Sequence, residues 1–219
     1  MSNHLWLGCG DIHEDFGKVL SLPELNQADG ILIAGDLTNR PCVEKTRGFL
    51  LTLKERCPNV WAQIGNMDSF EIEEVLDELG INVHLQVVEL IPDLCLAGVG
   101  YSTPTPFNTP SEVSEKAMAK WLQELKPKLK DKKHVIFMTH TPPVNTKCDI
   151  VLSGAHVGSQ AVREFVEEVQ PDICLTGHIH ESKGIDEIGQ TLVVNPGPVG
   201  QGGYVKIWYR DQRLEVELN

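Results

Sequence analysis

The stretch GILIAGD, residues 30–36, combines a short apolar run with a glycine and a terminal carboxylate. An apolar run of this length bounded by glycines is typical of a buried strand, and the polar side chain that follows it lies beyond the strand end. Comparable runs recur along the chain. They predict strands at residues 4–9, 30–34, 60–64, 94–99, 134–138 and 173–175.

Segments between these runs carry apolar residues at three- and four-residue spacing, as amphipathic helices do. They predict helices at residues 43–56, 72–79, 113–129 and 160–169. Strands that alternate with helices indicate βαβ crossovers and a largely parallel sheet. After Gly177 the pattern changes, and turn residues separate short strands predicted at 183–188, 191–194, 204–209 and 213–218. This last part is typical of an antiparallel end to the fold.

The length of the chain favours one domain over two. The sequence has 219 residues, of which 41% are hydrophobic and 23% charged, so it can bury one sizeable core. We therefore expect residues 1–219 to form a single α/β domain, in which two packed sheets are flanked by helices.

Charge and composition also limit the partners and the compartment. The formal net charge of -12 repels nucleic-acid backbones, so we expect no long nucleic-acid partner. No apolar stretch approaches the roughly 18 residues of a membrane helix, and the N-terminal residues lack a signal-peptide pattern. Six scattered cysteines without metal-type spacing indicate reduced thiols. These features predict a cytoplasmic location and no membrane partner, and they leave the oligomeric state open.

Metal-competent side chains follow five of the predicted strands. The candidate ligands are Asp11, His13, Asp36, Asn66, His140, His178 and His180. Open α/β sheets bind ligands beyond the carboxyl ends of their strands, so we expect these side chains to meet at one place. Residues two apart in an extended segment point the same way, and each of the pairs 11/13 and 178/180 can therefore serve one cluster.

Seven donors exceed what a single first-row ion takes, and they favour two divalent metal ions about 3.5–4 Å apart that share a carboxylate. Asp36 stands alone after its strand and is the natural bridge. A donor set rich in imidazole and free of thiolate favours Mn or Fe, with Zn or Ni possible. Two such ions with two carboxylates leave a net charge of about +2, which suits a phosphate ester and activates bound water.

The motifs resemble those of the calcineurin-like metallophosphoesterases. They occur in the order Asp11-Ile-His13, Gly35-Asp36, Gly65-Asn66, Thr139-His140 and Gly177-His-Ile-His180. The resemblance implies a four-layer α/β/β/α sandwich with two mixed β-sheets flanked by helices. It also implies that Asp36 bridges the two metals. One metal would be bound by Asp11, His13 and His180, and the other by Asn66, His140 and His178.

The runs HTPP at 140–143, GAHVGS at 154–159 and GHIHES at 177–182 resemble a small phosphodiesterase branch of this family. The function expected from the resemblance is a dinuclear, metal-dependent phosphodiesterase that acts through a metal-bridging hydroxide. Its substrate would be a small phosphate ester such as a cyclic nucleotide. The alternatives are a phosphomonoesterase, acting on a protein or a small molecule, and a metal-binding scaffold without turnover.

One position departs from the family pattern. Members with monoesterase activity usually carry a histidine after the asparagine of the Gly-Asn motif, and here Met67 stands there. A thioether donates no proton. We expect either Asp68 or His156 to take the catalytic role, unless the enzyme depends on a good leaving group. Asp68 is equally interpretable as a helix cap, and His156 as an ordinary loop residue before a helix.

Two further expectations concern the surroundings of the site. The proline-rich segment 101–110 forms either one wall of the substrate cleft or a plain surface connection. His134 precedes its strand instead of following it, so we expect it at the edge opposite the metal site.

Overall fold

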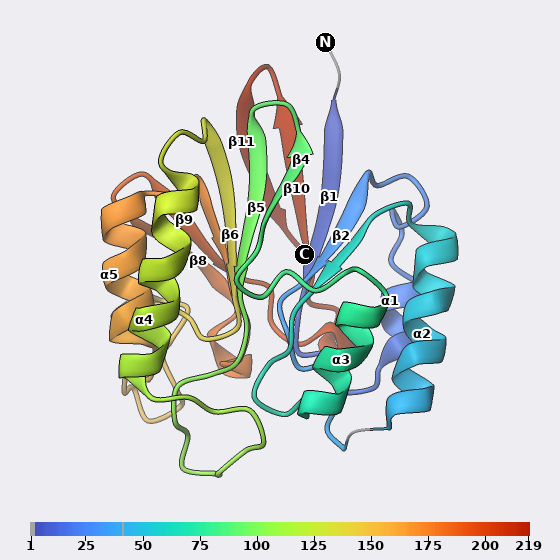
Figure 1. Ribbon diagram of the computed structural model, residues 1–219, viewed down its shortest axis with the longest axis horizontal. Coiled ribbons are helices and arrows are strands. Elements are labelled where there is room, and N and C mark those ends of the chain that lie inside the picture. Colours follow the sequence, from blue (N-terminus) through green and yellow to red (C-terminus); the bar gives the residue numbers. More distant parts are fainter. Residues whose placement is uncertain (1–2, 41) are drawn as a thin grey trace.

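Two mixed β-sheets pack face to face between two layers of helices in the computed structural model, which describes residues 3–40 and 42–219 (Figure 1). The first sheet has the strand order β11-β10-β1-β2-β3. Its strands are β1 (His4–Cys9), β2 (Gly30–Ile33), β3 (Val60–Ala62), β10 (Val205–Arg210) and β11 (Arg213–Leu218). The strands β1, β2 and β3 are parallel, whereas β10 is antiparallel to both of its neighbours.

The second sheet has the order β4-β5-β6-β7-β9-β8. Its strands are β4 (Val87–Ile91), β5 (Leu94–Val99), β6 (His134–Thr139), β7 (Ile173–Leu175), β8 (Gly184–Ile188) and β9 (Thr191–Asn195). The four central strands are parallel, and β4 and β8 are antiparallel edges. The expected antiparallel end is therefore correct for β8, β10 and β11, but β9 runs parallel to β7.

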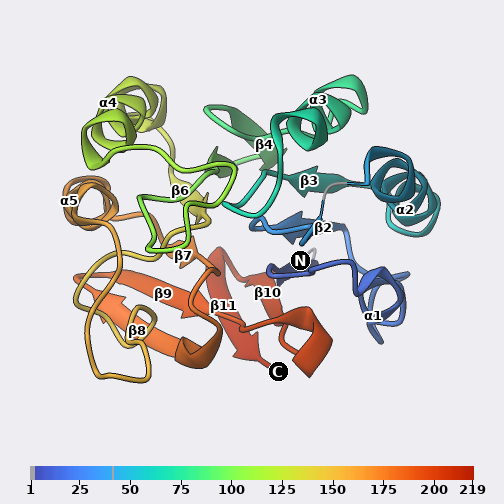
Figure 2. The ribbon, with the colours of Figure 1, turned by 90° about the horizontal axis from the view of Figure 1, so that it is seen from below.

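Helices cover the outer face of each sheet, as Figure 2 shows from below. The first sheet is covered by α1 (Phe16–Leu20), α2 (Val43–Arg56) and α3 (Phe70–Glu78). The second is covered by α4 (Glu115–Leu125), its 3₁₀ extension (Lys126–Leu129) and α5 (Gln160–Val169). Pro127 lies in that extension and lacks the N–H that an α-helix requires, so the helix predicted at 113–129 divides there.

Alternation along the strands creates three apolar cores. In β1, Leu5 and Leu7 pack with the helices of the first sheet, whereas Trp6 points to the other face. There it packs with Leu96 and Ile136 of the second sheet in a central core between the two sheets. The architecture is thus an α/β/β/α sandwich, which confirms the expected fold class.

Two elements were absent from the sequence prediction, α1 and β4. The helix α1 has only five residues, of which Phe16 and Val19 are buried, so it shows no full helical period. The strand β4 is a partly exposed edge without apolar alternation. Among the helices that the structure describes, none is long and apolar enough to cross a membrane. All six cysteines are free, and Cys42 is the exposed one.

Candidate metal centre

The seven candidate ligands lie together beyond the carboxyl ends of the parallel strands. Asp11 and His13 follow β1, Asp36 follows β2 and Asn66 follows β3, all in the first sheet. The second sheet supplies the remaining three ligands, His140 after β6 and His178 and His180 after β7. Two overlapping groups form, Asp11 with His13 and His180, and Asp11 with Asp36 and His140. Within each group the ligand atoms lie within 4.8 Å of one another.

The first group presents two imidazoles to one point. The Nε2 atoms of His13 and His180 are 3.1 Å apart, and His180 Nε2 lies 3.5 Å from Asp11 Oδ1. The Nδ1 atom of His13 is buried without a hydrogen-bond partner in the described structure. The atoms that converge are the two Nε2 atoms and Asp11 Oδ1, and lone pairs gathered this closely suit a shared cation.

The second group is built around His140. This side chain is fully buried, and its Nδ1 donates to the carbonyl of Ala34 at 2.9 Å. That bond leaves Nε2 with a free lone pair, as in metal-bound histidines. The Nε2 atom faces Asn66 Oδ1 at 2.9 Å and Asp36 Oδ2 at 3.4 Å, so three acceptor atoms converge. The ring of His178 lies beside it, with the centroids 5.0 Å apart.

Asp36 connects the two groups. Its Oδ2 lies 3.4 Å from His140 Nε2 and 3.8 Å from His13 Nε2. Its Oδ1 accepts a hydrogen bond from the backbone N–H of Met67 at 2.8 Å, which fixes the orientation of the carboxylate. The geometry therefore suits a carboxylate shared by two cations.

Backbone strain is concentrated at the cluster. Asp11, His13, Asp36 and His178 have φ values of 49°, 48°, 51° and 71°. Residues with a Cβ rarely adopt this left-handed region, and strain of this kind persists where surrounding contacts hold it. Here the N–H groups of residues 12 and 13 both donate to the carbonyl of Asp36, at 2.7 and 3.0 Å. The strained loops of β1 and β2 thus support each other.

Glycines allow the ligand loops to approach closely. A Cβ at Gly65 would overlap the carboxylate of Asp36, and one at Gly177 would lie 2.8 Å from Asp11 Oδ2. Gly35 has a φ of +108°, which L side chains rarely adopt. Steric constraints therefore explain why glycine precedes Asp36, Asn66 and His178 in the motifs.

The local electrostatics favour ligation. Burial opposes ionisation of Asp11, yet the hydrogen bond to His180 and the neighbouring histidines hold its pKa at about 2. Burial also opposes protonation of His140, but the charge of Asp36 outweighs it and raises its pKa to about 9. Burial and the charge of His140 lower the pKa of His178 to about 4. Cations at the site would displace the proton of His140, because metal and proton compete for the same nitrogen.

Asp68 lies beneath the cluster instead of in the cleft. Its side chain is 0% exposed, and its two oxygens accept four hydrogen bonds. The donors are the N–H groups of Leu37, Thr38 and Gly65 and the hydroxyl of Thr38, at 2.8–3.0 Å. The four donors favour the ionised form, whereas burial and the charge of Asp36 oppose it and raise the pKa of Asp68 to about 7. These contacts favour a role in positioning the loops that carry Asp36 and Asn66, and the catalytic role expected for Asp68 stays a prediction. Asp68 is not a helix cap, since Ser69 precedes α3.

The contacts of His156 also point to a positioning role. Its Nδ1 lies 2.6 Å from Asp149 Oδ1, and Asp149 is fully buried. The same carboxylate accepts from the N–H groups of Thr146 at 2.9 Å and Gly158 at 3.0 Å. The ring of His156 is not part of the cleft lining. These contacts favour an anchoring role for His156 in the loop between β6 and α5, and the expected contact with substrate stays a prediction.

Sequence reasoning missed a residue that orients Asn66. The Nδ2 of Asn66 donates to Thr109 Oγ1 at 3.0 Å, which directs its carbonyl oxygen toward His140. The hydroxyl of Thr109 in turn donates to Glu112 Oε1 at 2.5 Å. The hydroxyl is in a loop 43 residues from Asn66, and only the proline-rich character of that loop indicated its importance.

A cleft of about 1070 Å³ opens over the cluster. Five candidate ligands line it, namely His13, Asp36, Asn66, His178 and His180. Residues 103–107 and Thr109 form part of its wall, which favours the first of the two interpretations of the 101–110 segment. Met67 also lines the cleft, together with residues 151–153 and Val157.

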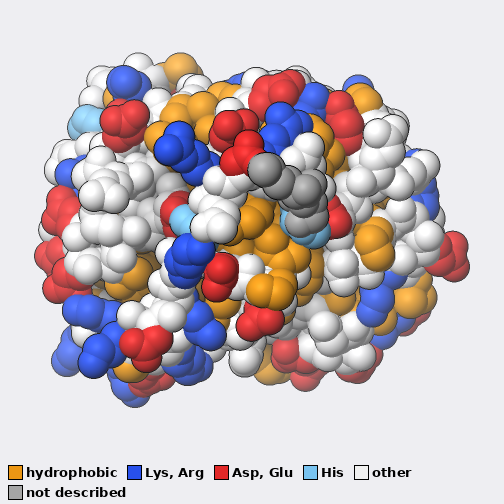
Figure 3. All heavy atoms as spheres, turned by 90° about the horizontal axis from the view of Figure 1, so that it is seen from above, with side chains coloured by type: hydrophobic (Ala, Val, Ile, Leu, Met, Phe, Trp, Pro, Cys, Tyr) orange, Lys and Arg blue, Asp and Glu red, His pale blue; other side chains and the backbone are white. Residues whose placement is uncertain are grey.

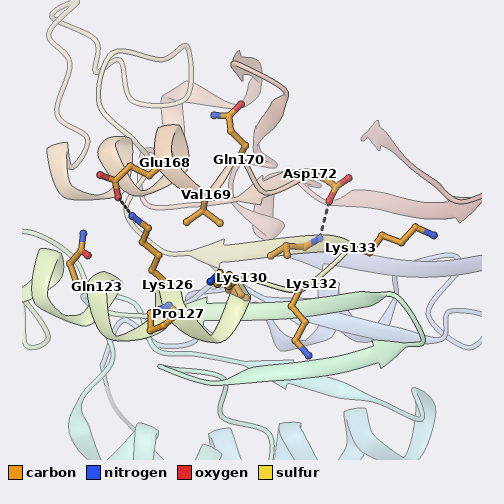
Figure 4. A pocket seen from close by; sticks show the side chains of 12 residues that line it. Gln123, Lys126, Pro127, Lys130, Lys132, Lys133, Glu168, Val169, Gln170 and Asp172 are labelled. Carbon is orange, nitrogen blue, oxygen red and sulfur yellow. Dashed lines mark hydrogen bonds and ion pairs between the residues drawn. The ribbon is translucent and has the colours of Figure 1, made fainter.

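A separate cavity of about 500 Å³ lies at the opposite edge, where Figure 3 shows basic side chains. Figure 4 shows its lysines, of which Lys126 pairs with Glu168 at 2.8 Å. His134 lies at this edge as expected, with Nδ1 2.9 Å from Asp172 Oδ1. The metal-ligand groups found in the described residues lie at the other end of the molecule, so the larger cleft is the candidate active site.

The sandwich fold and a cleft built on histidines and carboxylates define a metal-dependent phosphoesterase. The chain belongs to the calcineurin-like phosphoesterases, whose family model matches residues 6–182. It is 35% identical over 179 residues to an uncharacterized protein of Methanocaldococcus jannaschii, with 78% of each chain covered. The enzyme class predicted from the motifs is thereby confirmed.

Solved structures show the same fold at lower identity. A Thermus thermophilus protein has a TM-score of 0.73 at 22% identity, with 99% of each chain covered. A dimetal phosphatase from Danio rerio has a TM-score of 0.70 at 11% identity, covering 98% of this chain and 95% of its own. These two similarities establish the architecture and do not extend to a substrate.

Proposed function

We propose that the protein is a dinuclear metal-dependent phosphodiesterase that hydrolyses a small substrate such as a cyclic nucleotide. The observation that carries the proposal is the convergence of oxygen and nitrogen donors in two overlapping groups at one cleft, which five of the seven candidate ligands line. In this proposal Asp11, His13 and His180 hold one ion. Asn66, His140 and His178 hold the other, and Asp36 is shared.

The donor set suits Mn or Fe best, and Zn or Ni also fit imidazole and carboxylate ligands. When bound, the metal pair supplies the positive charge that activates water and stabilises the pentavalent transition state. The residues of the chain orient these ligands. Asp68 holds the two ligand loops together, and Thr109 turns the Asn66 carbonyl inward.

The preference for diesters rests on what lines the cleft. Met67 occupies the position of the usual proton donor, and neither Asp68 nor His156 reaches the cleft surface. No lysine or arginine occurs among the cleft-lining residues that the structure describes. A monoester dianion would thus find only the metals to neutralise its second charge, whereas a diester carries a single charge.

We also propose that residues 1–219 act as one domain in the cytoplasm on a small-molecule substrate. The free cysteines, five of them buried, suit a reducing compartment. The net charge of -12 disfavours long nucleic acids as substrates.

The test is hydrolysis of a nitrophenyl phosphodiester beside the matching monoester, with metal-stripped protein resupplied with Mn. We expect the diester to be cleaved faster and both activities to vanish on chelation. Faster monoester cleavage would replace the proposal with a phosphomonoesterase. Retention of two metals without turnover of either ester would contradict both.

A further inference from the structure

Large apolar side chains stand exposed at the rim of the active-site cleft. Phe107 is 79% exposed, Leu152 91% and Val157 41%, and all three line the cleft. They are three of the five large hydrophobic residues that are exposed in residues 3–40 and 42–219. Clustered exposure of this kind marks a binding surface, since isolated apolar residues on a surface are ordinary but grouped ones are costly.

The loop that carries Phe107 is held in place by Glu112. Its Oε1 accepts from the hydroxyls of Thr105 and Thr109 at 2.6 and 2.5 Å and from the N–H of Thr109 at 2.8 Å. The N–H of Phe107 donates to Thr105 Oγ1 at 3.1 Å. The ring is therefore presented to the cleft by an ordered loop, which lowers the entropy lost when it covers a ligand.

The loop that carries Leu152 and Val157 is also held in place by hydrogen bonds. The N–H of Val157 donates to the carbonyl of Asp149 at 3.0 Å, and the buried Asp149 carboxylate binds the loop from inside. The N–H of Leu152 donates to Glu181 Oε1 at 3.2 Å. Glu181 is the neighbour of the candidate ligand His180 in sequence, so this bond links the apolar rim to the segment that carries His180.

The charges that line the cleft disfavour a substrate with further negative groups besides its one phosphate. The ionisable groups along the described lining are the candidate ligands and Glu181, an acid. Lysines gather instead at the separate cavity of Figure 4, at the opposite edge of the molecule. A second phosphate on the substrate would therefore meet an acidic and apolar wall without a cation to pair with it.

We propose that the cleft selects phosphodiesters that have a single charged phosphate and a large apolar group, which Phe107, Leu152 and Val157 cover. The inference rests on the proposed phosphodiesterase function and specifies its substrate class. The phosphate lies at the metal centre, and the apolar group displaces water from the exposed rim. Removal of that apolar area from water supplies the selectivity.

The experiment compares methyl, butyl and octyl nitrophenyl phosphodiesters with the Mn-loaded protein. Their nitrophenolate leaving group is the same, so differences report contacts of the alkyl chain. We expect kcat/KM to rise at least about tenfold from methyl to octyl, since each buried methylene contributes up to about fourfold. Phe107→Ser and Leu152→Ser should lose most of this rise, measured as the ratio of kcat/KM for the octyl ester to that for the methyl ester.

Phe70→Ser and Leu51→Ser are the matched controls. Phe70 is 62% exposed and Leu51 47%, and neither lines the cleft, so both variants should retain the full alkyl preference. An equal loss in these controls would assign the effect to general surface hydrophobicity and overturn the inference. A flat alkyl series with clear methyl-ester turnover would overturn it as well, while the proposed function would stand.

A nucleobase and an alkyl chain both offer apolar surface, and a second experiment distinguishes which of the two the cleft prefers. Cyclic AMP is compared with the cyclic phosphate of ribose, which lacks the base. A preference for cyclic AMP that Phe107→Ser removes would identify the ring as a stacking platform for a base. A preference confined to the alkyl series would identify a chain as the natural group.

Binding provides a readout that does not depend on turnover. Calorimetry of octyl methylphosphonate against methyl methylphosphonate should show tighter binding of the octyl compound, and Phe107→Ser should abolish the difference. If no phosphodiester is hydrolysed but this binding preference holds, the proposed function fails and the apolar site stands. Equal binding of the two phosphonates would contradict the inference directly.

Discussion

His178 donates its backbone N–H to both carboxylate oxygens of Asp11, at 3.0 and 3.1 Å, across 167 residues of sequence. Asp11 follows β1 in the first sheet, and His178 follows β7 in the second. The bond therefore joins the two sheets at the metal cluster, and the geometry of the candidate ligands depends on how the sheets pack. Changes at the ligands should accordingly be visible in both metal content and stability.

Asp36→Asn should remove nearly all activity and at least one metal ion. The substitution keeps the shape of the side chain but removes the charge shared between His13 and His140. Elemental analysis after dialysis and diester turnover measure the outcome. His134→Ala is the control, because His134 pairs with Asp172 at the opposite edge and should leave metal content unchanged. Full metal content and turnover in Asp36→Asn would contradict the shared-ligand assignment.

Asp68→Asn should destabilise the protein by about 3 kcal/mol or more, since an amide nitrogen would face donors that now bind a carboxylate. It should also weaken metal binding, because the loops of Asp36 and Asn66 lose their common anchor. Urea unfolding and a metal titration measure the two effects. A catalytic acid would behave differently, with stability and metal affinity intact and an altered pH profile of kcat.

Thr109→Val should lower metal affinity by roughly tenfold, the usual effect of losing a group that orients a ligand. Valine keeps the volume of threonine but cannot accept the hydrogen bond from Asn66 Nδ2. Competition with a chromogenic chelator measures the affinity. Thr52→Val serves as the comparison, since its hydroxyl donates only to the carbonyl of Gly48 within α2. Equal affinities of the two variants would show that Thr109 does not orient Asn66.

Protonation of His84 should decrease the free energy of unfolding as the pH falls from 6.5 toward 4. Burial lowers the pKa of His84 from 6.5 to about 4, and Asp77 opposes this only in part. The unfolded chain then binds more protons than the folded one in this window. The contribution of His84 is therefore complete above pH 6.5 and is lost toward pH 4, by at most about 1.4 kcal/mol per pH unit.

Urea unfolding of the wild type and of His84→Gln across this window isolates the effect from other titrating groups. The ring of His84 packs against Tyr101 and Trp121, and its Nδ1 accepts from the N–H of Gly100 at 3.1 Å. Glutamine can accept the same bond but does not titrate. We expect a shallower pH dependence in the variant, and identical slopes would refute the assignment.

Much of the architecture was predictable because its signals are local. The helices α2 and α5 begin and end at the predicted residues, since apolar spacing and the Ser159 cap are encoded within each segment. The strands β1 and β5 also match, because short apolar runs between turn residues are unambiguous. The helix α1 and the edge strand β4 were missed, since neither has a pattern of its own and both depend on packing against a neighbour.

The roles of polar side chains near the site were less predictable. Asp68 is adjacent to the Gly-Asn motif, which made it a candidate acid, yet its partners at residues 37 and 38 come from another strand end. Thr109 orients Asn66 from a loop that carries no recognisable motif. Hydrogen bonds between distant loops depend on the positions of whole strands, which no local pattern specifies.

The sequence by itself determined most strand and helix segments, though not α1 and β4, and the seven candidate ligands that follow the strand ends. The segments and the ligands follow from side-chain chemistry and from spacing along the chain, and these signals need no contacts between distant residues. The tertiary structure alone decided which sheet each late strand joins and how the two sheets meet at Asp11 and His178. It also decided that Phe107 and Leu152 stay exposed at the cleft. These outcomes depend on contacts between residues far apart in sequence, where many weak interactions sum over the whole fold.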